Sequence, residues 1–134
     1  MNKAESIDGI KDIIDGYDVF ILDQWGVMHN GKEGYNAAIK CVETLYAYNK
    51  ILIIISNSSK RKHTSADRLS DFGYSKNYFL GIMTSGEMIW QSLVHLNHDF
   101  TKKLQKNCFH IYDKSKEDGK KYLEGLEKFN FVAN

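Results

Sequence analysis

An aspartate at the end of an apolar run is the strongest candidate for chemistry in this sequence. Asp23 follows the apolar residues 19–22 and precedes Gln24-Trp25-Gly26, so its carboxylate stands beside a glycine turn. A carboxylate in such a position can act as a nucleophile or as a metal ligand. The alternative is structural, because an aspartate can also cap a turn through hydrogen bonds to its own backbone.

A second candidate is the polar segment that follows the apolar run 51–55. Ser56 and Asn57 supply a hydroxyl and an amide, and the cations Lys60 and Arg61 follow shortly after. A loop with successive backbone N–H groups after a buried strand can hold a phosphate group. The alternative is a polar turn with a solvated Lys-Arg pair. Because both motifs are present, we favour phosphate binding.

The elements that must position these residues alternate along the chain. The expected strands are residues 18–23, 51–55, 78–84, 109–112 and 129–132, and the expected helices are residues 37–48, 65–72 and 85–97. Parallel strands need crossover helices between them, so this order predicts an α/β protein with an open, doubly wound, mainly parallel sheet. Ligands of such sheets bind beyond the carboxyl ends of the strands. We therefore expect Asp23, Ser56 and Thr84-Ser85 to meet at one edge.

The composition narrows the class of protein. The chain has 134 residues, 43% of them hydrophobic, which is enough for one globular domain, taken as residues 1–134. Its 18 basic residues nearly balance its 17 acidic ones, which argues against nucleic acid or an anionic membrane as partner. The longest apolar run is far too short to span a bilayer, and the N-terminus lacks an apolar signal core. We expect a cytoplasmic protein with reduced cysteines.

The order and spacing of the motifs resemble the haloacid dehalogenase-like superfamily, in particular its subfamily IIA, from Tyr17 onward. Asp23 matches the family's nucleophile, which forms an aspartyl-phosphate, and Gly26 matches the glycine of the same motif. Ser56 matches the Ser or Thr of the second motif, and Asn57 begins a segment similar to the family's phosphate loop. The resemblance implies a magnesium-dependent phosphatase with a Rossmann-like core and a small phosphorylated substrate.

Two further segments extend the resemblance. Residues 84–87 (Thr-Ser-Gly-Glu) are similar to the segment that starts a helix in subfamily IIA, and residues 129–132 resemble the strand that leads into its cap domain. The family's later motifs, a lysine and an acidic pair, lie beyond that cap. We therefore expect the chain to be the N-terminal half of the hydrolase core, without the cap.

The sequence departs from the family at Trp25. Most members have a second aspartate there, and an indole cannot exchange protons with a leaving group or water as a carboxyl group does. The family's metal ligand at this position is the backbone carbonyl, which Trp25 retains. The resemblance thus implies a weak Mg²⁺ site formed by Asp23 and the carbonyl of Trp25, with impaired catalysis.

The chain is also expected to associate with another polypeptide segment. In the resembling fold, a later strand pairs with the segment 19–22, so we expect this edge to take a second copy, a swapped segment or a complementing chain. A non-catalytic binding or assembly module is the second hypothesis for function.

His29, in the loop after Asp23, is expected to be a solvated side chain, with contact to substrate as the alternative.

Overall fold

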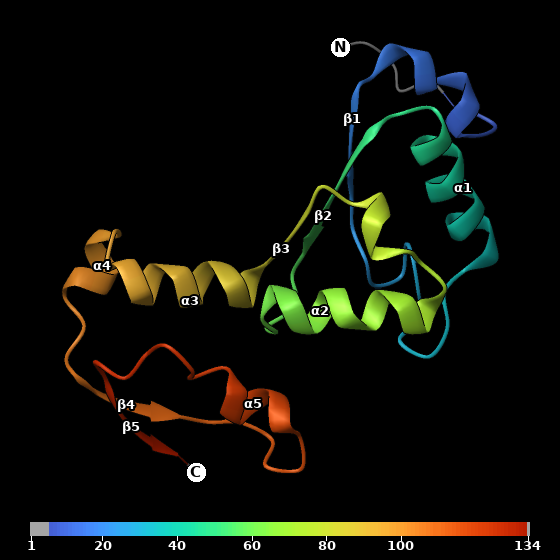
Figure 1. Ribbon diagram of the computed structural model, residues 1–134. Helices are drawn as coiled ribbons and strands as arrows, with labels where there is room; N and C mark the ends of the chain where they lie inside the picture. The colour runs from blue at the N-terminus through green and yellow to red at the C-terminus, as the bar shows by residue number, and fades with distance from the viewer. Residues whose placement is uncertain (1–5, 134) are drawn as a thin grey trace. The chain divides into compact units, whose positions relative to one another are not determined.

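The computed structural model describes residues 6–133 and divides into two compact units (Figure 1). The first unit comprises the residues up to 56 together with residues 66–83. The second unit comprises residues 57–65 and the residues from 84 onward.

A three-stranded sheet forms the centre of the first unit. Its strands are β1 (Val19–Leu22), β2 (Ile51–Ser56) and β3 (Gly81–Thr84), in the order β1-β2-β3. β1 and β2 run parallel, with Val19 opposite Ile51 and Leu22 opposite Ile54. Their β-branched and aromatic residues favour a pleated backbone. β1 lies at an edge of this sheet, as the sequence predicted.

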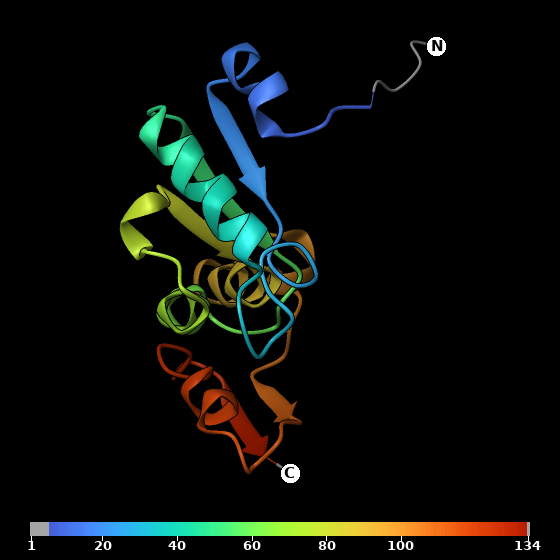
Figure 2. The ribbon, with the colours of Figure 1, turned by 90° about the vertical axis from the view of Figure 1, so that its right-hand side faces the viewer.

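Helix α1 (Asn36–Ala47) packs on one face of this sheet. Helix α2 (Lys62–Leu69), of which residues 62–65 belong to the second unit, adds Leu69 to the same core. Short 3₁₀ turns lie at Ile10–Asp12, Ile14–Gly16, Ser70–Phe72 and Lys76–Tyr78. Figure 2 shows α1 running alongside the strands. Alternate strand residues meet the helices in one apolar cluster made of Ile14, Phe20, Met28, Val42, Leu45, Leu52, Ile54, Leu69, Phe72 and Tyr74. Burying one such side chain contributes about 2 kcal/mol.

The opposite face of the same sheet is apolar but exposed. Its residues are Val19, Ile21, Ile51 and Ile55, of which Ile21 is 63% exposed. They alternate with the core residues because successive side chains of a strand point to opposite faces. Parallel sheets are normally covered on both faces, so this surface is unusual for its class.

The second unit contains α3 (Ser85–His95), α4 (Asp99–Lys102), β4 (Asn107–His110), α5 (Glu117–Lys121) and β5 (Asn130–Ala133). β4 and β5 lie side by side as a parallel pair, with Cys108 opposite Phe131 (Figure 1). α3 begins at a Thr84 cap and ends at Leu96, which has a positive φ of 48°. β4 and β5 therefore form a two-stranded sheet separate from that of the first unit.

The predicted α/β class, with parallel sheets and an incomplete Rossmann-like core, is confirmed. One difference is that the sequence placed all five strands in one sheet, whereas the structure divides them between a three-stranded and a two-stranded sheet. A second difference is that α2 begins at Lys62 rather than at 65 and ends in a 3₁₀ turn. Within residues 6–133, no helix is long and apolar enough to cross a membrane.

Candidate functional site

The loop after β1 presents Asp23 at the surface. Its carboxylate Oδ1 accepts the Gln24 N–H at 2.8 Å. The Gln24 carbonyl accepts the N–H of Met28 at 2.8 Å, and the Gly26 N–H donates to the His29 carbonyl at 2.8 Å. Gly26 has φ +79°, a conformation that L side chains rarely adopt. The loop is thus a tight turn that holds the aspartate in a defined place.

The Trp25 side chain is largely exposed, and its ring contacts residues 29 and 31 of the same loop. It is 63% exposed, and its ring lies so close to Gly31 that a Cβ on residue 31 would stand 2.3 Å away. The ring also meets His29 edge-on, with centroids 5.8 Å apart. The indole therefore packs within the loop and does not provide a proton-transfer group.

His29 is buried, so the expectation of a solvated side chain was wrong. Its ring stacks on Phe72 with centroids 4.0 Å apart, and its Nδ1 accepts the Gly31 N–H at 3.1 Å. Burial, together with the Arg68 guanidinium, lowers the pKa of His29, against a smaller opposing effect of Asp23. The buried His29 ring thus joins the loop to the core through its contact with Phe72.

The structure brings Asp23 and Ser56 to the same edge of the sheet. Leu22 is opposite Ile54 in the parallel pair, so Asp23 follows β1 where Ser56 ends β2. Ser56 is buried, with 5% of its surface exposed, whereas Asp23 is exposed. Thr84 ends β3, also as expected, but it belongs to the second unit, where it caps α3.

Asn57 is exposed and is the first residue of the second unit. The loop that follows it packs against the start of α3. The Gly86 N–H donates to the Ser58 carbonyl at 3.0 Å, and the Thr84 hydroxyl donates to the Lys60 carbonyl at 2.5 Å. The Thr84 hydroxyl also accepts the Glu87 N–H at 3.0 Å, as an N-cap residue does.

Glu87 is a buried carboxylate that the sequence analysis did not single out. It is 2% exposed and accepts hydrogen bonds from Arg61 Nε at 2.7 Å, from the Lys62 N–H at 3.2 Å and from Gln91 Nε2 at 3.3 Å. Burial alone would raise the pKa of Glu87, but the Arg61 and Lys62 bonds lower it below its usual range. The Thr84-x-x-Glu87 spacing, typical of a helix start, was the available signal.

The two cations of the loop have specific partners. The Arg61 guanidinium lies over the Trp90 ring, 3.6 Å from its centroid, while its Nε pairs with Glu87. Lys60 Nζ pairs with Asp118 at 2.5 Å. Arg61 is therefore held in a structural arrangement, and the expected alternative of a solvated Lys-Arg pair does not describe it.

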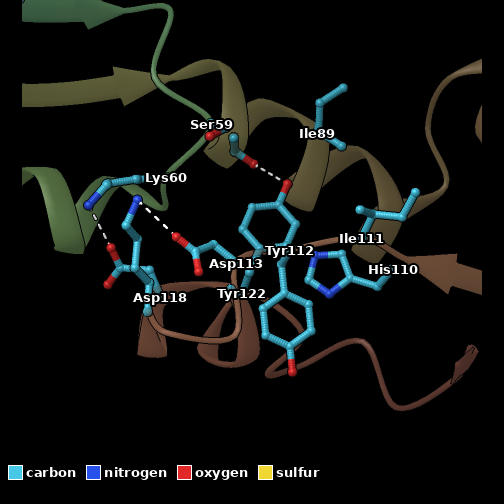
Figure 3. Close-up of a pocket in the computed structure, with 12 residues that line it drawn as sticks. Ser59, Lys60, Ile89, His110, Ile111, Tyr112, Asp113, Asp118 and Tyr122 are labelled. Carbon is cyan, nitrogen blue, oxygen red and sulfur yellow. Dashed lines mark hydrogen bonds and ion pairs between the residues drawn. The ribbon is translucent and has the colours of Figure 1, made fainter. Parts of the chain in front are cut away.

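A pocket of about 480 Å³ lies within the second unit (Figure 3). It is lined by Ser59, Lys60, Gly86, Ile89, His110, Ile111, Tyr112, Asp113, Lys116, Asp118, Gly119 and Tyr122. The His110 ring stacks on Tyr112 at 4.9 Å, and its Nδ1 is buried with no hydrogen-bond partner among the described residues. Burial lowers the pKa of His110. The pocket thus combines aromatic rings with two Lys-Asp pairs.

The residues available for a metal are few. Among residues 6–133, no group of three or more His, Cys, Asp or Glu side chains is placed to hold a metal ion. Asp23 and the Trp25 carbonyl offer oxygen ligands, the type that Mg²⁺ takes, but one Asp23 oxygen already accepts a backbone N–H. A Mg²⁺ ion at this place would have to take most of its ligands from outside these two residues.

Comparisons with known proteins agree with the motifs. A family model described as haloacid dehalogenase-like hydrolase matches residues 20–128. The crystal structure of a haloacid dehalogenase-like family hydrolase from Brucella suis is similar with a TM-score of 0.76 and 23% identity, over 95% of this chain and 42% of that one. A hypothetical protein from Pyrococcus horikoshii is similar with a TM-score of 0.53 and 21% identity, over 87% and 41%.

The chain therefore spans about two fifths of the length of these two solved structures. No curated protein matches the sequence. The two structural likenesses support the fold, and the family model, which covers most of the sequence, supports the membership that the motifs around Asp23 and Ser56 implied. The chain belongs to the haloacid dehalogenase-like hydrolase family.

Proposed function

We propose that the chain carries the nucleophile half of a magnesium-dependent phosphohydrolase that acts on a small phosphorylated molecule. One observation carries the proposal: an exposed carboxylate, Asp23, and a hydroxyl, Ser56, stand at the carboxyl ends of two adjacent parallel strands. Ligands of open α/β sheets bind at that edge. Family membership supports hydrolase chemistry at the same place.

In the proposed reaction, a carboxylate oxygen of Asp23 attacks the phosphorus of a phosphate monoester. A P–O bond to Asp23 forms and the ester P–O bond breaks, and the leaving oxygen takes its proton from water because the Trp25 indole is too weak an acid to supply one. A water molecule then attacks the phosphorus of the aspartyl-phosphate and gives up a proton to solvent, while the P–O bond to Asp23 breaks, so that inorganic phosphate leaves and the Asp23 carboxylate is restored. The Ser56 hydroxyl and Asn57 hold the phosphoryl oxygens, and Gly26 allows the turn beside them.

The proposal includes a weak Mg²⁺ site at Asp23 and the backbone carbonyl of Trp25. When bound, the cation would offset the negative charge of the phosphoryl group. A site with one carboxylate and one carbonyl leaves most of the coordination shell to water, so we expect low affinity.

The test is phosphatase activity of the purified chain with p-nitrophenyl phosphate and Mg²⁺. Turnover that disappears in Asp23→Asn would support the proposal, because the amide is a poor nucleophile of similar shape. Turnover equal in the two proteins would contradict it. Mass spectrometry of the quenched reaction would show an added phosphoryl group on the wild-type chain and none on the variant.

A binding or assembly module is the second candidate function, and the exposed face of the three-stranded sheet favours it. Val19, Ile21, Ile51 and Ile55 form an apolar surface beside the edge strand β1. Unpaired edges and apolar patches of this kind are sites of association. We propose that this surface takes a second copy of the chain or a complementing polypeptide.

Light scattering after gel filtration tests this second candidate. We expect a mass above that of one chain, and a single-chain mass for Ile21→Lys, which places a charge on the exposed face. A wild-type chain that stays a single chain at high concentration, alone and mixed with a host-cell extract, would contradict the assembly role. Ile7→Lys, at another exposed apolar position, is the matched control.

A further inference from the structure

The backbone of the loop after Asn57 is fixed by the first turn of α3. The Ser58 carbonyl accepts the Gly86 N–H at 3.0 Å, and the Lys60 carbonyl accepts the hydroxyl of Thr84, which is fully buried. Ser59 lies between them, so close that a Cβ on residue 86 would stand 2.0 Å from its carbonyl oxygen. Three consecutive loop residues are thereby held against the helix.

The next two residues are held by one side chain. Glu87 takes the Arg61 Nε at 2.7 Å and the Lys62 N–H at 3.2 Å through the same oxygen, while its other oxygen accepts from Gln91. The Arg61 guanidinium is fixed from its other side by the Trp90 ring at 3.6 Å. Every residue from 58 to 62 therefore contacts α3 or its cap.

The Arg61–Glu87 ion pair is buried, whereas a turn at the protein surface needs no buried charges. Removing a carboxylate and a guanidinium from water is unfavourable, and the pair recovers this free energy only when its geometry is good and its remaining hydrogen bonds are made. Glu87 is 2% exposed and its two oxygens have three donors, so those conditions are met. Replacing a buried ion pair by apolar side chains of similar size is often neutral for stability, so stability alone does not account for this pair.

We propose that Glu87 is a positioning residue: with Thr84 and Gly86, it fixes the conformation of residues 58–62, the loop that continues the phosphate-binding segment at Ser56 and Asn57. The inference rests on the proposed function of that segment. Glu87 also holds Arg61 through its Nε, while the guanidinium lies over the Trp90 ring.

The test separates positioning from stability. In the double variant Glu87→Leu/Arg61→Met, apolar side chains of similar length replace the ion pair, a change that is often neutral for folding. We expect its melting temperature to stay near that of the wild type. We expect its affinity for inorganic phosphate with Mg²⁺ to fall about tenfold, because a loop that must be ordered on binding lowers affinity.

Phosphate binding is measured by titrating the ¹⁵N-labelled full chain and following the amide signals of Ser58, Ser59 and Lys60. Asp67→Asn removes an exposed ion pair with Lys76 and serves as the control with unchanged affinity. In the phosphate-free protein, the three loop amides should already shift in the double variant and not in the control.

The outcomes are distinguishable. A wild-type chain that does not bind phosphate overturns the proposed function and, with it, the role of the loop in binding. A wild-type chain that binds, with a double variant of equal affinity, overturns the positioning role alone. Loop amide signals that are identical in the phosphate-free wild type and double variant overturn the positioning role independently of any ligand.

Discussion

The two units have interiors of different chemistry. In the first unit, ten buried apolar side chains form one cluster across β1, β2, α1 and the end of α2. In the second unit, the buried apolar side chains among the described residues are Leu126 and Phe129, and the buried polar ones are Ser65, Thr84, Glu87, Ser92 and Thr101. The first unit therefore depends on hydrophobic burial and the second on satisfied hydrogen bonds.

The same contrast applies to the buried ionisable groups. In the first unit, burial and the nearby Arg68 lower the pKa of His29, which disfavours its charged form. Glu87 in the second unit is kept charged, because donors surround it. A small unit buries a smaller share of its surface, so directed polar contacts must specify its shape.

The largest expected effect comes from truncating the apolar cluster. Leu52 is 1% exposed at the centre of the sheet. Leu52→Ala should lower the free energy of unfolding by about 2–5 kcal/mol, because it removes buried methyl groups and leaves a cavity. Urea unfolding followed by circular dichroism measures this. The neighbouring Ile51→Ala, on the exposed face, should cost less than about 1 kcal/mol; equal losses would contradict the contrast between the two faces.

Sequence patterns predicted the first unit better than the second, for a physical reason. The runs 18–23 and 51–55 are apolar at nearly every position, so they are close to the observed β1 and β2. Their parallel order then brought Asp23 and Ser56 to one edge. Hydrophobic periodicity reports burial, and burial is what holds this unit together.

The second unit depends on contacts that periodicity does not report. The buried ion pair of Arg61 and Glu87 joins residues 26 positions apart, and neither position is apolar. The separate pairing of β4 with β5 was also missed, because a short apolar run indicates a strand but not its neighbour. His29 was misassigned for a similar reason, since its stacking partner Phe72 is distant in the sequence.

A smaller effect is expected from adding one methyl group to the second unit. In Gly86→Ala, the new Cβ would stand 2.0 Å from the backbone oxygen of Ser59, so the loop or the helix must shift. We expect a loss of about 1–3 kcal/mol, the usual cost of overpacking. Gly16→Ala is the matched control, because a Cβ there meets nothing within 4 Å. Equal stability of the two variants would show that the loop is not held tightly against α3.

The smallest effect expected is a difference in pH dependence. The folded-state pKa of His29 lies below its ordinary value of 6.5, so the unfolded chain binds the proton more readily. Stability should therefore decline as the pH falls below 6.5, and the decline should end below the folded-state pKa. His110, whose pKa is also lowered by burial, should add to the same window.

Glu87 should affect folding stability over a more acidic pH range than His29. Its folded-state pKa lies below the ordinary 4.5, so its contribution is complete above pH 4.5 and is lost as the pH falls through the lowered value. Urea unfolding between pH 3 and 8 measures both windows. His29→Phe should flatten the slope just below pH 6.5, and Glu87→Gln should flatten only the slope below 4.5. If Glu87→Gln altered the upper window instead, the buried carboxylate would not be charged in the folded protein, and the polar interior of the second unit would need another explanation.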